Sequence, residues 1–195
     1  QAVTMTEAGV ARLERIWRGA ETVPGLPLTE PQLIGLAEAL AIRGVPNAEA
    51  ILDEQEGRIT NPDRLARFRF VRPAMSAEAE VRDSLFASFQ SVEQRRRESW
   101  VLDAMGALHH PLRADGMRHQ IRPALDLVVP IQETGDIFFP LRWMNALLDG
   151  HRSPEAAEIV RGFLAERTDL PPRLRGKLLQ AADELFRAVL VASEK

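Results

Sequence analysis

Four histidines are the residues of this chain that most readily do chemistry, because imidazole binds metals and transfers protons near neutral pH. They are His109, His110, His119 and His151. A helix that binds catalytic zinc needs the pattern His-Glu-x-x-His, which places two imidazoles on one face and a glutamate beside the metal-bound water. That pattern does not occur, and the adjacent His109 and His110 would point about 100° apart on a helix. We therefore assign no metal ligand and expect the histidines to cap helix ends or to lie at the surface.

Nucleophile and phosphate-binding motifs are also missing from the sequence. No Gly-x-Ser-x-Gly turn occurs, and Ser76, Ser91 and Ser153 stand where a helix cap or a turn is expected. The glycine-rich loops that bind phosphates or dinucleotides do not occur either. Neighbouring carboxylates such as Asp53 and Glu54 are most often solvated on charged helices. We therefore assign no catalytic residue and no cofactor-binding residue to this chain.

The densest positive charge lies in QRRRESW, residues Gln94–Trp100. One interpretation is a solvated helix face on which Glu93 and Arg97 form a weak i,i+4 ion pair. The other is that Arg95 or Arg96 lines a cleft and binds an anionic group, since guanidinium holds a carboxylate through two hydrogen bonds. The sequence favours the solvated face and leaves the second interpretation open.

A second unusual stretch is GDIFFPLRW, residues Gly135–Trp143, which crowds large side chains into one turn between helical runs. We expect Phe138, Phe139 and Trp143 to be rigid apolar anchors that lock one helical hairpin on the next. Arg142 is the residue of this corner that could also line a groove.

Composition indicates an ordinary globular protein. Hydrophobic residues make up 45% of the 195 residues and charged residues 27%. No apolar run approaches the roughly 20 residues of a membrane helix, so we expect no membrane partner. The net charge of −3 gives no field that attracts nucleic acid, although the basic residues are nearly all arginine. Cysteine is absent, which fits a reducing compartment, and we expect the protein in the cytoplasm.

Helical patterns run through nearly the whole sequence. In TEPQLIGLAEALAIRG, Thr29 and Gln32 have the spacing of a capping box. Asn61-Pro62 and Ser153-Pro154 each combine a capping side chain with a proline in the first helical turn. The most strand-like segment is Ile121–Ile131, and we favour a helix there as well.

These patterns predict an all-α fold of about ten helices joined by short loops. Antiparallel helices of this size usually stack as pairs into an α–α superhelix of the HEAT or armadillo kind. The segment VPGLPL, residues Val23–Leu28, is too short for a domain boundary. We therefore expect residues 1–195 to form a single helical domain. Because the chain starts at Gln1 without an initiator methionine, we also expect it to be part of a larger protein.

Four segments of the chain carry a family resemblance. They are NPDRLARFRFVRPAMS, RRRESWVLDAMGALHHPLR, QETGDIFFPLRWMNALLDGHRSPEAAEIVRGFL and LPPRLRGKLLQAADELFRA, which span roughly residues 60 to 190. In this order they resemble the C-terminal helical domain of bacterial aminopeptidase N-type (gluzincin) zinc metallopeptidases. The resemblance implies an upstream catalytic domain that carries Gly-Ala-Met-Glu-Asn and His-Glu-x-x-His and holds the zinc. This chain contains neither motif, so we expect it to be no enzyme by itself.

The resemblance also implies a role. Such a domain closes over the catalytic domain and shapes the chamber from which the enzyme removes N-terminal residues of peptides. Its partners would be its own upstream catalytic domain and the peptide substrates. In some members an arginine of this domain holds the free carboxylate of the peptide, and the candidates here are Arg142, Arg95 and Arg96.

Two other functions stay open on the sequence. One is a free-standing α-solenoid adaptor that presents its concave surface to a protein partner. The other is salt-sensitive binding of nucleic acid through the arginines, which the negative net charge disfavours.

Overall fold

The protein is all-α, as the sequence predicts. A computed structural model describes residues 6–193, and no β-strand occurs among them. Within the same range, no helix combines the length and the apolar character that crossing a bilayer requires. The helices form two compact units, of which the first ends at Arg82 and the second starts at Asp83. Each unit is described on its own, and the single domain and the superhelix expected from the sequence stay predictions.

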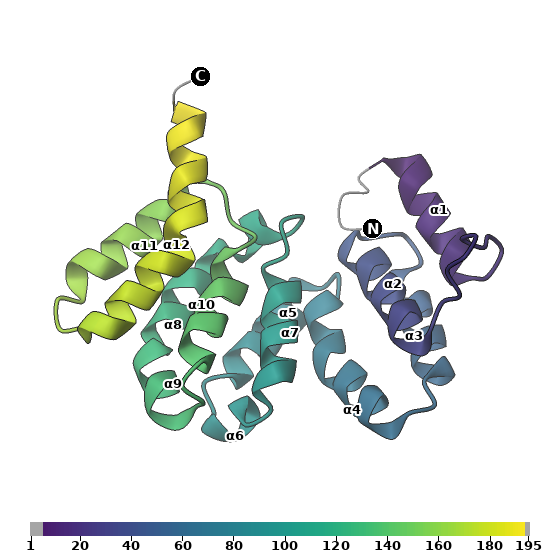
Figure 1. Ribbon diagram of the computed structural model, residues 1–195, viewed down its shortest axis with the longest axis horizontal. Coiled ribbons are helices and arrows are strands. Elements are labelled where there is room, and N and C mark those ends of the chain that lie inside the picture. The colour runs from purple at the N-terminus through teal and green to yellow at the C-terminus, as the bar shows by residue number, and fades with distance from the viewer. Residues whose placement is uncertain (1–5, 194–195) are drawn as a thin grey trace. The chain divides into compact units, whose positions relative to one another are not determined.

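The first unit is built around helix α2. Helix α2 (Glu30–Ile42) packs against both α1 (Glu7–Trp17) and α3 (Ala48–Arg58), as Figure 1 shows. Helix α4 (Pro62–Val71) and the 3-10 turn η1 (Arg72–Met75) complete the unit. Removing apolar side chains from water holds these helices together. The core cluster consists of Leu13, Ile16, Trp17, Leu36, Ala37, Leu40 and Ile51.

The second unit is built around helix α10 (Phe139–Leu148). This helix packs against α7 (Glu98–Leu108), α8 (Ile121–Asp126), α9 (Val128–Thr134) and α12 (Pro172–Ser193). Helix α11 (Pro154–Glu166) packs against α8 and α12. Helix α5 (Ala79–Ser88) spans the boundary between the units. The remaining elements are α6 (Val92–Arg95) and the 3-10 helix η2 (Ala114–Gln120). The helix expected over Ile121–Ile131 is confirmed as α8 and the first half of α9.

The expected caps are present at the starts of three helices. The backbone N–H of Thr29 donates to Oε1 of Gln32 over 2.8 Å, which forms part of the capping box of α2. Asn61 Oδ1 accepts a hydrogen bond from the third residue of α4 over 3.0 Å, and Ser153 Oγ does the same for α11 over 3.2 Å. These side chains satisfy backbone donors that a helix start leaves without partners.

The corner formed by residues 135–143 is buried only in part. Trp143 is fully buried, its ring meets those of Phe89 and Phe139 edge-on, and its Nε1–H donates to the carbonyl of Ala124 over 3.0 Å. Phe138, expected to be a third anchor, is instead 65% exposed. Successive side chains at a helix start point in different directions, so Phe138 faces away from the core that Phe139 enters.

Candidate functional site

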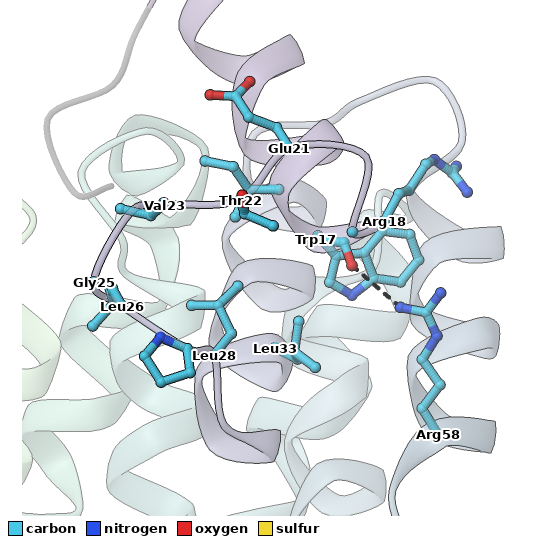
Figure 2. A pocket seen from close by; sticks show the side chains of 13 residues that line it. Trp17, Arg18, Glu21, Thr22, Val23, Gly25, Leu26, Leu28, Leu33 and Arg58 are labelled. Carbon is cyan, nitrogen blue, oxygen red and sulfur yellow. Dashed lines mark hydrogen bonds between the residues drawn. The ribbon is translucent and has the colours of Figure 1, made fainter.

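The first unit contains a groove beside the end of α1. Helix α1 ends at Trp17, and the chain turns at Gly19, whose φ of 75° favours glycine. The loop that follows runs to Thr29 and forms one side of the groove, while Arg58 of α3 lies on the other (Figure 2). We name this hollow the Trp17 groove; its volume is about 690 Å³, a size typical of ligand-binding clefts. Its apolar lining consists of Ile16, Trp17, Val23, Leu26, Pro27, Leu28 and Leu33.

The tryptophan at the base of the groove is fixed from two sides. Trp17 is 1% exposed, and its Nε1–H donates to Oε1 of Gln55 over 2.8 Å. The guanidinium of Arg58 lies 4.5 Å from the centre of the indole ring and donates to the carbonyl of Trp17 over 3.3 Å (Figure 2). A cation above the indole face is attracted by the electrons of the ring. Trp17 is therefore held rigidly beneath the groove, and the more exposed apolar side chains of the loop, such as Leu26, form its accessible surface.

Ion pairs surround this apolar space. Arg58 pairs with Glu54, and Arg18 lies between Glu54 and Glu14, with N–O distances of 3.5 Å and 2.9 Å. On the loop side, Glu21 accepts hydrogen bonds from two arginines of α1, Arg12 and Arg15, and the bond from Arg12 is the main reason that its pKa is lowered. Because the neighbouring charges are paired with one another, the groove is suited to binding an apolar group.

Arg95 and Arg96, two of the arginines singled out in the sequence, have opposite surroundings. Arg95 is only 3% exposed, and its Nη1 donates to the carbonyls of Phe89 and Gln90 over 2.5 Å and 2.9 Å. Burial lowers the pKa of its guanidinium. The side chain of Arg96 is 71% exposed and pairs with Glu93 over 3.1 Å. Arg95 thus stabilises the turn after α5, whereas Arg96 lies on the solvated face that the sequence favours.

Arg142, the third arginine, lies in a different place. It projects from α10 into a depression of about 370 Å³, which it shares with Asp103 of α7 and with Asp149. Arg95 and Arg96 line another depression, of about 400 Å³, together with Thr134 and Glu98. The structure therefore brings Arg95 and Arg96 together and keeps Arg142 apart from them.

Sequence reasoning missed a pair of buried histidines. His109 and His151 are each 1% exposed, so neither has the surface role that was one expectation, whereas His109 does lie at a helix end, directly after α7. His109 Nδ1 lies 3.0 Å from His151 Nε2. They are 42 residues apart, so no local spacing reveals the pair. Among residues 6–193, no group of three or more potential ligands converges to hold a metal ion.

Comparison of the chain with protein-family models, with curated proteins and with solved structures found no match. The family resemblance of the four sequence segments therefore stays a prediction.

Proposed function

We propose that the chain is the non-catalytic C-terminal helical domain of a zinc aminopeptidase. The observation that carries the proposal is the ordered set of four segments that resemble this domain over roughly residues 60 to 190. The all-α fold is the fold that the resemblance implies. Residues of these segments, among them Leu108, Trp143, Phe163 and Leu178, form the fully buried core of the second unit.

In this role the chain shapes the space around the substrate and does no bond chemistry itself. The zinc ion would be held by the upstream catalytic domain, outside this chain, and would supply the Lewis-acid chemistry for peptide hydrolysis there. The helical domain limits which peptides reach it, by shape and by charge. Of the three arginines, Arg142 and Arg96 suit contact with a peptide carboxylate better than Arg95, whose guanidinium is already engaged by two carbonyls. Arg142 is our first choice because Arg96 is paired with Glu93.

The test uses the complete reading frame that encodes this chain. We expect it to encode His-Glu-x-x-His upstream, and the full protein to hydrolyse an aminoacyl 4-nitroanilide that residues 1–195 alone leave intact. Turnover by the isolated chain, or a reading frame without the zinc motif, would overturn the proposal.

The role of Arg142 has a separate test in the full protein. Arg142→Ala should raise KM about tenfold for peptides with a free C-terminal carboxylate, which corresponds to the loss of about 1.4 kcal/mol of binding. The same peptides with an amidated C-terminus, and the nitroanilide, should be hydrolysed as by the wild type. An equal effect on all three substrates would assign Arg142 a structural role.

A second candidate function is an adaptor that binds an apolar segment of a protein partner, and the Trp17 groove favours it. Leu26 lines the groove and is 49% exposed, so it can be changed without disturbing the core. Leu26→Glu should abolish capture of apolar peptides selected on the wild-type chain. Leu179→Glu, at a leucine of the second unit that is 46% exposed, is the matched control and should bind as before. Peptides that bind both variants equally do not use the groove.

A further inference from the structure

A pair of buried histidines joins two segments of the second unit. His109 directly follows α7 and caps its C-terminus, and His151 lies in the loop between α10 and α11. Their rings approach to 3.0 Å between Nδ1 and Nε2, and we name them the histidine clasp. The backbones are also in close contact, because a Cβ atom on Gly150 would lie only 1.7 Å from the carbonyl oxygen of His109. The clasp therefore lies where the backbone of the α10–α11 loop contacts the end of α7.

The clasp contains one N–H group that has no acceptor, whichever tautomer it adopts. A neutral imidazole carries one N–H donor and one acceptor nitrogen. If His109 donates to His151, the Nδ1–H of His151 has no partner; in the reverse case, the Nε2–H of His109 has none. A pair with two protonated rings loses its hydrogen bond as well, because both facing nitrogens then carry hydrogen. With one ring protonated the bond remains, but two buried N–H groups, at Nε2 of His109 and Nδ1 of His151, then have no acceptor, so the clasp favours two neutral rings.

Burial is the main cause that keeps both rings neutral. It lowers the pKa of His151 to about 4 and the pKa of His109 well below its usual value. Each ring also responds to charges outside the clasp. The groups that face the two rings are Asp115, Arg118 and His119 of η2 and Arg152 of the loop. Of these, Asp115 favours a charged His151, whereas Arg118 and Arg152 oppose it, and His119 opposes a charged His109.

We propose that the histidine clasp is an acid-sensitive latch. It holds the α10–α11 loop against the end of α7 while both rings are neutral, and it releases the loop when the pair takes up protons. This inference goes beyond the proposed function and does not depend on it.

The direction of the pH effect follows from the pKa values. In the unfolded chain the histidines titrate near 6.5, whereas in the folded chain they titrate lower. Between about pH 6.5 and pH 4 the unfolded chain therefore binds more protons, and stability falls as the pH falls. His151 alone should raise the unfolding equilibrium constant of the second unit about 30-fold between pH 7.5 and pH 5.

The test is urea unfolding of the full 195-residue chain at pH 7.5 and pH 5. The double variant His109→Gln, His151→Gln keeps hydrogen-bonding side chains that do not titrate, and it should lose most of the acid-dependent rise. His110→Asn removes a histidine outside the clasp, keeps an acceptor for the N–H of Leu112, and should keep the rise. The same rise in the double variant would overturn the proposal.

If the double variant does not fold, two measurements on the wild-type chain still test the latch. In the wild-type chain, ¹⁵N NMR of labelled imidazoles should find His109 and His151 neutral at pH 6, with one nitrogen protonated in each ring. A charged ring at either position at that pH would overturn the latch. Hydrogen exchange of the His151 amide, which donates to Leu148 over 3.0 Å, should accelerate at pH 5 beyond its intrinsic rate as the loop opens.

Discussion

Neighbouring arginines of the same run should differ widely in their effect on stability. Arg95→Ala removes a buried donor that serves two backbone carbonyls, so it should destabilise the second unit by about 2 to 3 kcal/mol. Arg96→Ala removes a pair in which both side chains are largely exposed, and little measurable change is expected. Urea denaturation of the two variants checks this. Equal losses would mean that the burial of Arg95 does not persist in solution.

Two glycines give opposite predictions for the same substitution. Gly150→Ala places a methyl group 1.7 Å from the carbonyl oxygen of His109, so the loop must shift, at a cost of about 1 to 3 kcal/mol or more. Gly162 lies within α11 and has open space where a Cβ would be, so Gly162→Ala should stabilise by about 0.5 to 1 kcal/mol. Thermal unfolding of both variants tests whether the backbone contact at Gly150 requires glycine and whether position 162 does not. Similar shifts in both variants would contradict the contact at Gly150.

Single residues are where sequence reasoning reached its limit. Phe138 and Phe139 are indistinguishable by type, yet one is 65% and the other 2% exposed. Which of the two is buried depends on the rotation of α10 against its neighbours, and local sequence does not encode it. The histidine clasp was missed for the same reason, since its members meet only in the tertiary fold. The sequence favoured a solvated position for Arg95. Its two acceptors are backbone carbonyls, and because every residue has one, the sequence does not show which of them a buried arginine will bind.

At the scale of elements, caps make a direct prediction. Asn61→Ala removes the acceptor for the N–H of Arg64 and should cost about 1 kcal/mol in the first unit. Asn61→Asp keeps an acceptor and adds a charge that favours the helix start, so it should retain wild-type stability. Denaturation followed by circular dichroism measures both. Equal losses in the two variants would show that the cap is not formed in solution.

Helices were predictable because their signals are local. A capping residue, a proline in the first turn and an apolar stripe lie within a few residues of one another, so Thr29, Asn61 and Ser153 could be read directly. Helix ends are harder to read from sequence: Gly57 is of the residue type that most often follows a helix, but α3 includes it and ends at Arg58. The Trp17 groove could not be predicted, because it forms only where a loop, α2 and the end of α3 come together.

At the scale of the whole molecule, the chain divides into two compact units, and the single domain expected over residues 1–195 stays a prediction. Each unit has its own buried core: Leu40 is fully buried in the first, and Leu178 is fully buried in the second. A lesion in one core acts on the other unit only if the two unfold together. The cooperativity of the chain is therefore measurable by damaging one core at a time.

Leu40→Ala and Leu178→Ala are matched lesions, each expected to cost about 2 to 5 kcal/mol in its own unit. Native-state hydrogen exchange followed by mass spectrometry reports the two units separately. If they are independent, Leu40→Ala should lower protection up to Arg82 and leave the core amides beyond it unchanged, and Leu178→Ala should do the reverse. Parallel loss of protection in both units from either variant would instead establish one cooperative domain. In that case the two units would act together as one cooperative domain in the proposed role of shaping the substrate chamber.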